Sequence, residues 1–253
     1  MAITAPDGNR TRYLELLKNI LINFIYLEYD PSLLVVDANE SPEVRRGLGR
    51  DWPKMALTMV GKVRLDNLQY CIEDILARKV PGDFVETGIW RGGSVILMRA
   101  VLEAYQVRDR IVWAADSFCG LPPPDTERFP ADAGDPHSTF EYLRVPLETV
   151  KSNFNKFGLL DDQTRFVEGF FDETLPGIPV ENLALLRLDG DMYGSTYVAL
   201  ESLYPKLSPG GFVIIDDYGV LPRCAAAVDD YRRANNIDQA MVEVDWSARF
   251  WIK

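Results

Sequence analysis

Four carboxylates close two apolar runs of this chain. They are Asp189, Asp191, Asp216 and Asp217. The first pair belongs to residues 183–193 and the second to residues 211–218, and in each stretch the apolar residues precede the acids. Acids gathered at one site repel each other, and a hard divalent cation with oxygen ligands, such as Mg2+, would supply the counter-charge.

The two apolar runs have the pattern of strands buried on both faces, as in a parallel sheet covered by helices. The acids then stand at the carboxyl ends of these strands, which is the edge where open α/β sheets bind ligands. Asp189 and Asp191 are two positions apart, and in an extended segment such residues point to the same side. We therefore expect the acids to converge on one crevice.

Strand and helix patterns alternate from residue 83 to the end of the chain, as in a doubly wound parallel sheet. Beyond the two acidic strands, the pattern predicts strands at residues 83–86, 110–115, 164–168, 240–244 and 249–252, the last two as a hairpin. Helices are expected at residues 93–105, 147–157, 195–207 and 223–234. We expect one domain over residues 1–253, with a catalytic core at 83–253 and a helical extension or lid at 13–79.

The N-terminal extension carries an apolar stripe at helical spacing over residues 13–29, which packs either against the body or against a second subunit. This stripe favours a homo-oligomer. Residues 37–50 are charged and rich in turn formers, which indicates an exposed, mobile connection. The sequence Asp51-Trp52-Pro53 is typical of a helix start, and residues 55–78 are helical in pattern with a break near Gly61.

The net charge and the cysteine content indicate which kinds of partner the protein binds and in which compartment it works. The formal net charge of -11 over 253 residues opposes binding to nucleic acid or to an anionic membrane, so a small-molecule substrate is expected. The three cysteines are widely spaced and predict neither a disulfide framework nor a zinc site. Residues 1–12 lack the apolar core of a signal peptide, which together with the cysteines predicts a cytoplasmic protein.

Residues 118–138 interrupt the alternation with five prolines and scattered acids. A loop of this length on the ligand-binding edge is typically a lid over the substrate, and the alternative is a surface excursion without function. The segment contains His137, the only histidine of the chain, so two-histidine metal motifs are excluded.

A glycine turn joins the strand near residue 83 to the next helix. Gly88 would let the backbone approach a ligand closely, although a simple strand-to-helix turn needs glycine too. Asp116 closes the second strand, where an acid accepts hydrogen bonds from ribose hydroxyls. The alternative for Asp116 is a helix cap or turn former.

Several segments together resemble the macrocin O-methyltransferase family, which comprises Mg2+-dependent enzymes that methylate sugar hydroxyls of antibiotics. The segments are Thr58–Gly61, Val85–Gly93, Ala115–Phe118, Leu186–Tyr193 and Ile214–Tyr218, supported by Leu207–Gly211 before the fifth strand. Asp-Gly-Asp paired with Asp-Asp is the distinguishing feature. The resemblance implies a class I methyltransferase (Rossmann-like) fold, with a seven-stranded, mostly parallel sheet and a C-terminal antiparallel hairpin.

The resemblance also implies roles for individual residues. Asp189, Asp216 and Asp217 would hold Mg2+ or Mn2+, and Asp191 would be the general base, with His137 as the rival base. The S-adenosylmethionine site would comprise Thr58, Met59, Glu86, Thr87, Gly88, Ser94, Asp116, Ser117, Gly169, Phe170 and Asp189. Some relatives have histidine where Asp191 stands.

The function expected on this basis is S-adenosylmethionine- and Mg2+-dependent O-methylation of a sugar hydroxyl in a natural product such as a glycoside. Adjacent hydroxyls of a sugar would chelate the cation and fix one oxygen in line with the methyl group. Two alternatives stay open, methylation of a small catechol-like acceptor and a nucleotide-binding module without catalysis. The intact acids argue against the second alternative.

Overall fold

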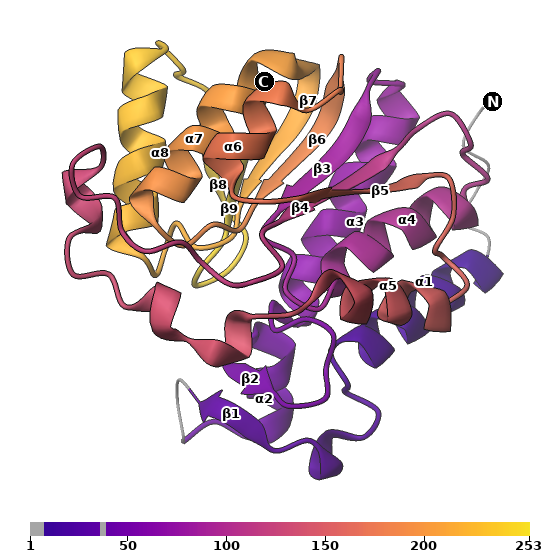
Figure 1. The fold of residues 1–253 in the computed structure, drawn as a ribbon. Coiled ribbons are helices and arrows are strands. Elements are labelled where there is room, and N and C mark those ends of the chain that lie inside the picture. Colours follow the sequence, from indigo (N-terminus) through magenta and orange to yellow (C-terminus); the bar gives the residue numbers. More distant parts are fainter. Residues whose placement is uncertain (1–7, 36–38) are drawn as a thin grey trace.

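The centre of the protein is a seven-stranded sheet, seen here in a computed structural model that describes residues 8–35 and 39–253 (Figure 1). The strand order is β5-β4-β3-β6-β7-β9-β8. The strands are β3 (Asp83–Thr87), β4 (Val112–Asp116), β5 (Thr164–Glu168), β6 (Leu183–Leu188), β7 (Leu207–Ile215), β8 (Val242–Glu243) and β9 (Arg249–Ile252). The five neighbouring strands β5, β4, β3, β6 and β7 are parallel, whereas β9 pairs antiparallel with both β7 and β8. The mostly parallel sheet with a C-terminal hairpin is therefore confirmed.

The sheet has a switch point between β3 and β6, because β4 and β5 extend it to one side and β7 to the other. Thr87 is in register with Leu188 where these two strands end. The amide of Asp189 donates to the carbonyl of Thr87 at 2.9 Å, so the chain segments after β3 and β6 start side by side. Ligands bind at such switch points in open α/β sheets.

Side chains alternate between two cores, one on each face of the sheet. Phe84, Leu185 and Phe212 pack into the core that also contains α1, α3, α4 and α5. Their neighbours Val85, Leu186 and Val213 pack into the other core, with α7 and α8. Successive side chains of a strand point to opposite faces of the sheet. Because both faces are covered by helices, consecutive positions must all be apolar.

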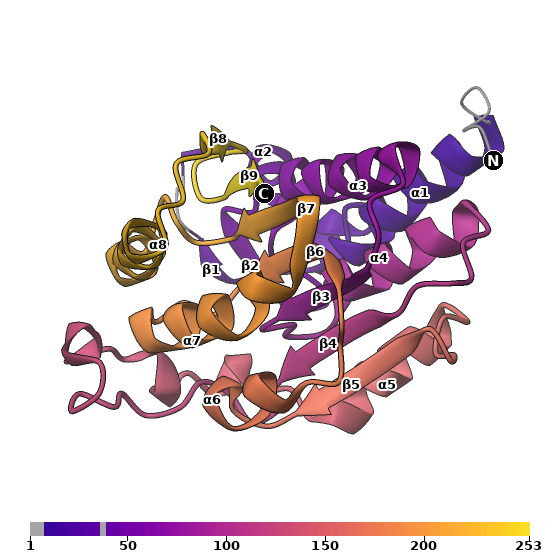
Figure 2. The ribbon, with the colours of Figure 1, turned by 90° about the horizontal axis from the view of Figure 1, so that it is seen from above.

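Helices cover both faces, with α1, α3, α4 and α5 on one side and α6, α7 and α8 on the other (Figure 2). Their bounds are α1 (Gly8–Leu21), α2 (Pro42–Leu48), α3 (Gly61–Arg78), α4 (Gly93–Ala104), α5 (Leu147–Lys156), α6 (Phe171–Thr174), α7 (Tyr193–Leu203) and α8 (Pro222–Ala234). Within the described parts of the chain, none of these helices combines the length and apolar character of a bilayer span.

The N-terminal part differs from the sequence prediction. Residues 51–53 form strand β2, which pairs antiparallel with β1 (Ser32–Val35), so the predicted helix start is wrong. The Asp51 carboxylate accepts hydrogen bonds from Arg46 Nε at 2.9 Å and from Ser32 Oγ at 2.8 Å, and is not available to cap a helix. Helix α1 ends at Leu21, and a short 3-10 turn covers Leu27–Tyr29 instead of a continued helix.

The charged connection predicted at residues 37–50 contains helix α2, although residues 36–38 lie outside the described structure. Ser41 caps this helix at its N-terminus, and the Arg46 side chain is buried, so residues 42–48 are an ordered element rather than a mobile link. Helix α3 begins at Gly61, where an added Cβ would lie 2.2 Å from the amide nitrogen of Gly49. This close approach joins α2 to α3.

Candidate active site

A cavity of about 390 Å³ opens at the carboxyl ends of β3, β4, β6 and β7. Its lining includes all four acids and His137, together with nine predicted cofactor residues: Thr58, Met59, Glu86, Gly88, Ser94, Asp116, Ser117, Phe170 and Asp189. Thr87 and Gly169 are outside the lining. The Thr87 side chain is buried in β3, and the amide of Gly169 donates to the carbonyl of Asp116 at 3.0 Å.

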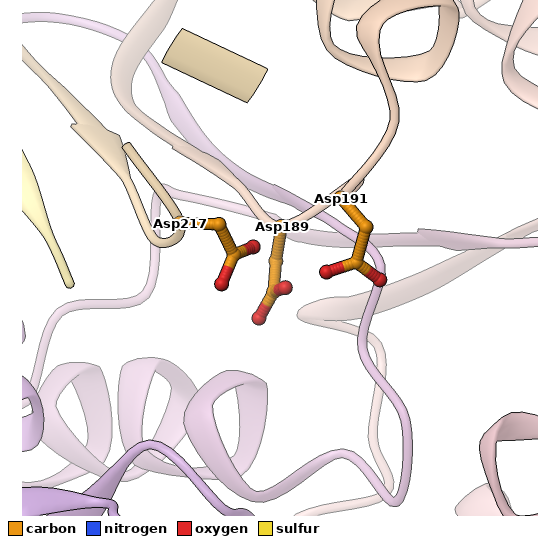
Figure 3. A group of neighbouring side chains, drawn as sticks. All are labelled: Asp189, Asp191 and Asp217. Carbon is orange, nitrogen blue, oxygen red and sulfur yellow. The ribbon is translucent and has the colours of Figure 1, made fainter. Parts of the chain in front are cut away.

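Three carboxylates meet at the centre of this cavity. Oxygens of Asp189, Asp191 and Asp217 all lie within 4.8 Å of one another, and their side chains point into the same space (Figure 3). Asp189 follows β6, whereas Asp217 follows β7. The segment between Asp189 and Asp191 is not extended, contrary to the prediction. Asp191 has a φ of 56°, and the amide of Met192 donates a hydrogen bond to the carbonyl of Gly190.

The three acids destabilise one another's charged forms. Burial raises the pKa of Asp189 well above its ordinary value, and repulsion from Asp216 adds to the effect. Burial also raises the pKa of Asp217 well above its ordinary value, followed by repulsion from Asp189 and Asp191. Burial raises the pKa of Asp191 as well, although His137 and a hydrogen bond with Asp217 oppose this shift.

These residues fit a hard divalent cation. Asp217 Oδ2 is buried and has no hydrogen-bond partner among the described residues. A buried, unpaired carboxylate oxygen is costly, and a cation would satisfy it while cancelling the repulsion within the cluster. The donor set consists of carboxylate oxygens, which suit Mg2+ or Mn2+.

Asp216 is also in the cavity wall but has other partners. Its carboxylate accepts from Arg64 Nη1 on one oxygen and from Arg187 Nη2 on the other. Both arginines are buried, Arg64 on α3 and Arg187 on β6. The charge of Asp216 is thus compensated by the protein, whereas neither Asp191 nor Asp217 forms an ion pair with another described residue.

Glu86 is fully buried at the end of β3. Its Oε1 accepts from Ser94 Oγ at 2.5 Å and from Arg187 Nη1, while its Oε2 has no partner among the described residues. Burial raises the pKa of Glu86, and Arg187 and Ser94 oppose the shift. Because Glu86 lines the cavity, its free oxygen is suited to accept a hydrogen bond from a bound ligand.

Gly88 is required by the fold itself. It has a φ of 76°, and an added Cβ would lie 1.7 Å from the carbonyl oxygen of Asp189. The predicted reason was close approach to a ligand, but the residue that crowds Gly88 is the first acid of the cluster. The glycine therefore serves the junction of β3 and β6 whether or not a ligand also approaches it.

Asp116 closes β4 and organises the adjoining turn. Its Oδ2 accepts from the amide of Ile89 at 2.8 Å, and its Oδ1 accepts from the amide of Phe118 at 2.7 Å. Burial raises the pKa of Asp116, while these amides lower it. Asp116 thus acts as a turn former, which was one of the two readings of the sequence, and it also lines the cavity.

His137 pairs with a carboxylate from its own segment. Its Nδ1 lies 2.7 Å from Oδ1 of Asp135, which is buried and also lies 3.6 Å from Arg223 Nη1. The imidazole lines the cavity, and its charge lowers the pKa of Asp191. The structure thus brings both candidate bases to one cavity.

The segment between β4 and α5 runs along the same edge of the sheet as the small β1–β2 sheet (Figure 1). It is tied to the core, since Asp132 accepts from the first amides of α7 and Arg223 on α8 donates to the carbonyls of Ala131 and Ala133. The cavity lining also includes apolar and aromatic side chains, some from this segment and some from other parts of the chain: Trp52, Leu121, Pro122, Phe129, Leu143 and Trp246.

Several of these contacts were not found from the sequence. Arg187 carried a usable signal, because it is a charged residue inside the otherwise apolar run Leu183–Leu188 and such a residue needs buried partners. Arg64 and Asp132 carried none, since their partners are distant in the chain.

Known proteins match nearly the whole chain. Residues 10–253 match the macrocin O-methyltransferase (TylF) family. The chain is 52% identical over 246 residues, covering 97% of it and 94% of the relative, to 8-demethyl-8-(2,3-dimethoxy-alpha-L-rhamnosyl)-tetracenomycin-C 4'-O-methyltransferase of Streptomyces olivaceus. It is 47% identical, covering 98% of both chains, to mycinamicin III 3''-O-methyltransferase of Micromonospora griseorubida.

Solved structures agree with these matches. The O-methyltransferase NovP has a TM-score of 0.90 and 44% identity, covering 96% of this chain and 99% of its own. The calicheamicin methyltransferase CalS11 has a TM-score of 0.61 at 19% identity, covering 98% of this chain and 94% of its own, and supports the fold alone. The class I methyltransferase fold and the predicted resemblance are thus confirmed, and the chain belongs to the macrocin O-methyltransferase family.

Proposed function

We propose that this protein transfers the methyl group of S-adenosylmethionine to a sugar hydroxyl of a glycosylated natural product, with a divalent cation at the acid cluster. The observation that carries the proposal is the meeting of Asp189, Asp191 and Asp217 in the same cavity as Glu86 and its unpaired oxygen. The name of the Streptomyces olivaceus relative, which specifies a rhamnosyl tetracenomycin acceptor, supports the sugar.

In this proposal S-adenosylmethionine would supply the methyl group from its sulfonium, and a cation held by the acid cluster would lower the pKa of the acceptor hydroxyl. The hydroxyl oxygen would form the new C–O bond as the methyl–sulfur bond breaks, and the products would be S-adenosylhomocysteine and the methyl ether. Asp191 accepts the hydroxyl proton and passes it to solvent. Its position in the cavity, beside Asp217 and His137, supports this role.

The cofactor side of the cavity would be formed by the residues that line it around β3 and β4. Glu86 Oε2 would accept a hydrogen bond from the cofactor, and Thr58 and Met59, which line the cavity from the N-terminal part, would cover it. Asp116, Ser117 and Phe170 would flank its nucleoside part. Thr87 and Gly169 would shape the backbone that surrounds the cofactor without contacting the cofactor themselves.

The cation would be held by Asp189, Asp216 and Asp217. Asp189 and Asp217 are supported by the cluster geometry. Asp216 would contribute while still bound by Arg64 and Arg187, since each carboxylate oxygen has more than one acceptor site. The competing set replaces Asp216 with Asp191.

Calorimetric titration of Mg2+ into Asp216→Asn and Asp191→Asn proteins distinguishes the two sets. The first variant should lose at least about tenfold in Mg2+ affinity, because even the loss of a group that only supports the metal ligands typically costs about 10- to 100-fold. The second should bind Mg2+ normally. The reverse result would make Asp191 the third ligand.

The activity itself is tested by incubating the protein with S-adenosylmethionine labelled in the methyl group, Mg2+, and a panel of acceptors. We expect label in glycosides with a free rhamnosyl hydroxyl, none in the matched aglycones, and loss of transfer in excess EDTA with recovery on adding Mg2+. Label in catechols instead of glycosides would overturn the sugar assignment. Full transfer in EDTA would overturn the cation requirement.

The exposed apolar side chains of the N-terminal part support a homo-oligomer. Leu16 and Ile20 on α1 are 53% and 40% exposed, and Tyr26, Tyr29 and Met55 nearby are more exposed still. A second copy would cover this face. Light scattering should then give a mass above that of one chain, and Leu16→Glu should reduce it; a monomer at micromolar concentration would contradict the proposal.

The state of the cysteines supports a reducing, cytoplasmic environment. Cys71 and Cys224 are buried as free thiols, and Cys119 is exposed. Free thiols persist in a reducing compartment. Fractionation of producing cells should recover the protein with cytoplasmic markers.

A further inference from the structure

We propose that Arg187 couples the cation site to the cofactor site, so that each ligand tightens the binding of the other. The inference rests on the proposed function for the identity of the two ligands. It concerns a residue that contacts neither the acceptor nor the methyl group in that proposal, and Arg187 is therefore a positioning residue.

Arg187 is the point where the two sites meet. Its guanidinium, on β6, is 2% exposed and contacts carboxylates that follow or end three strands. Nη1 donates both to Glu86 Oε1 and to Asp189 Oδ2, the latter at 3.0 Å, and Nη2 donates to Asp216 Oδ1. Glu86 belongs to the cofactor side, whereas Asp189 and Asp216 belong to the cation side.

The shared nitrogen gives the coupling its direction. Nη1 carries two hydrogens, one for Glu86 and one for Asp189, so both carboxylates share the positive charge of one guanidinium. A cation that binds the Asp189 carboxylate would compensate its charge, so the guanidinium would be freer to optimise its charge-assisted hydrogen bond with Glu86. Glu86, which lines the cavity and whose Oε2 has no partner among the described residues, would then be held more firmly.

The effect must be reciprocal, because a single coupling free energy describes how each ligand changes the affinity of the other. A cofactor bound at Glu86 draws Nη1 towards that residue, which leaves Asp189 freer to bind the cation. A lysine at this position would keep the charge but lose the fork of nitrogens that allows one side chain to serve three carboxylates.

The test is calorimetric and needs no turnover. S-adenosylhomocysteine is titrated into the full-length protein in Mg2+ and, at equal ionic strength, in EDTA. We expect wild-type protein to bind at least about fivefold more tightly with Mg2+, and Mg2+ to bind more tightly by the same factor with S-adenosylhomocysteine present. In Arg187→Lys this factor should fall to about one.

Arg64→Lys is the matched control. Arg64 also pairs with Asp216 and is also buried, but its second ion pair is with Asp245, and among the described residues it forms none with Glu86 or Asp189. This variant should change Mg2+ affinity while keeping the coupling factor. A coupling factor lost equally in both variants would mean that general charge, not Arg187, connects the sites.

Glu86→Gln keeps the test decisive if Arg187→Lys does not fold. It removes the carboxylate charge that attracts Nη1 on the cofactor side and leaves the acids of the cation site in place, so the coupling factor should again fall to about one. A wild-type factor of one, or an unchanged factor in the folded variants, overturns the coupling. Failure to bind S-adenosylhomocysteine or Mg2+ at all would instead overturn the proposed function.

Discussion

The carboxylate of Asp132 accepts a hydrogen bond from the amide of Tyr193 at 2.8 Å, and so a residue of the long β4–α5 segment caps the first turn of α7. Met192, the residue at the helix start, provides no side-chain cap of its own. Because Asp191 immediately precedes this turn, Asp132 connects the long segment to the proposed base.

Removing the cap should affect both stability and catalysis. We expect Asp132→Ala to lower the free energy of unfolding by about 1–2 kcal/mol, since the amides of Tyr193 and Gly194 lose their acceptor. Urea denaturation measures this, and kcat should fall more than the affinity for S-adenosylhomocysteine. Asp132→Asn, which retains an acceptor oxygen, should recover part of the stability. Unchanged stability in Asp132→Ala would show that the cap is energetically unimportant.

The two candidate bases give different results on substitution. Asp191→Asn keeps the size of the side chain and removes its basicity, so the methyl-transfer rate should fall by about 10²- to 10⁴-fold. Single-turnover kinetics measure this rate, and cofactor affinity should remain close to that of the wild type. His137→Ala is the comparison, because His137 lines the same cavity. If His137→Ala loses the rate and Asp191→Asn keeps it, His137 with Asp135 is the base.

Gly88 should tolerate no side chain. An added Cβ would collide with the carbonyl oxygen of Asp189 at 1.7 Å, so Gly88→Ala should lower the free energy of unfolding by about 3 kcal/mol or more. Gly158→Ala is the control, because its φ of 66° is similar but its added Cβ would meet nothing within 4 Å. That variant should lose only about 1–2 kcal/mol. Equal losses in both variants would contradict the contact with Asp189.

Glu103 should contribute to stability in a defined range of pH. Hydrogen bonds from Arg108 and Arg99 lower the pKa of Glu103 from 4.5 to about 2. The contribution is therefore present above pH 4.5 and is lost as the pH falls towards 2. The side chain is 41% exposed, so the effect should be below about 1 kcal/mol.

Denaturation of Glu103→Gln as a function of pH tests this contribution. The variant should be less stable than the wild type at pH 6 and approach it near pH 2. Glu148→Gln is the comparison, because Glu148 pairs with Lys151 while 83% exposed and should show little difference. A stability difference for Glu103→Gln that does not shrink with acid would refute the assignment.

The elements of the core follow from local sequence. The run Leu183–Leu188 is buried at every position, as a strand covered on both faces must be, and β5 and β9 have the predicted bounds. Side-chain periodicity acts over a few residues, so it is visible without the fold. The acids at strand ends were predictable for the same reason, because parallel strands bring their carboxyl ends to one edge.

Which of those acids meet was decided by partners far away in the chain. Asp216 and Asp217 are neighbours, yet Arg64, 152 residues earlier than Asp216, binds only the former, while Asp217 joins Asp189 and Asp191. The same holds for Asp51, whose carboxylate is held by Arg46 and Ser32 in a small sheet instead of starting a helix. A local pattern shows where a charge lies along the chain, but the free energy of a buried charge depends on the groups that packing brings around it.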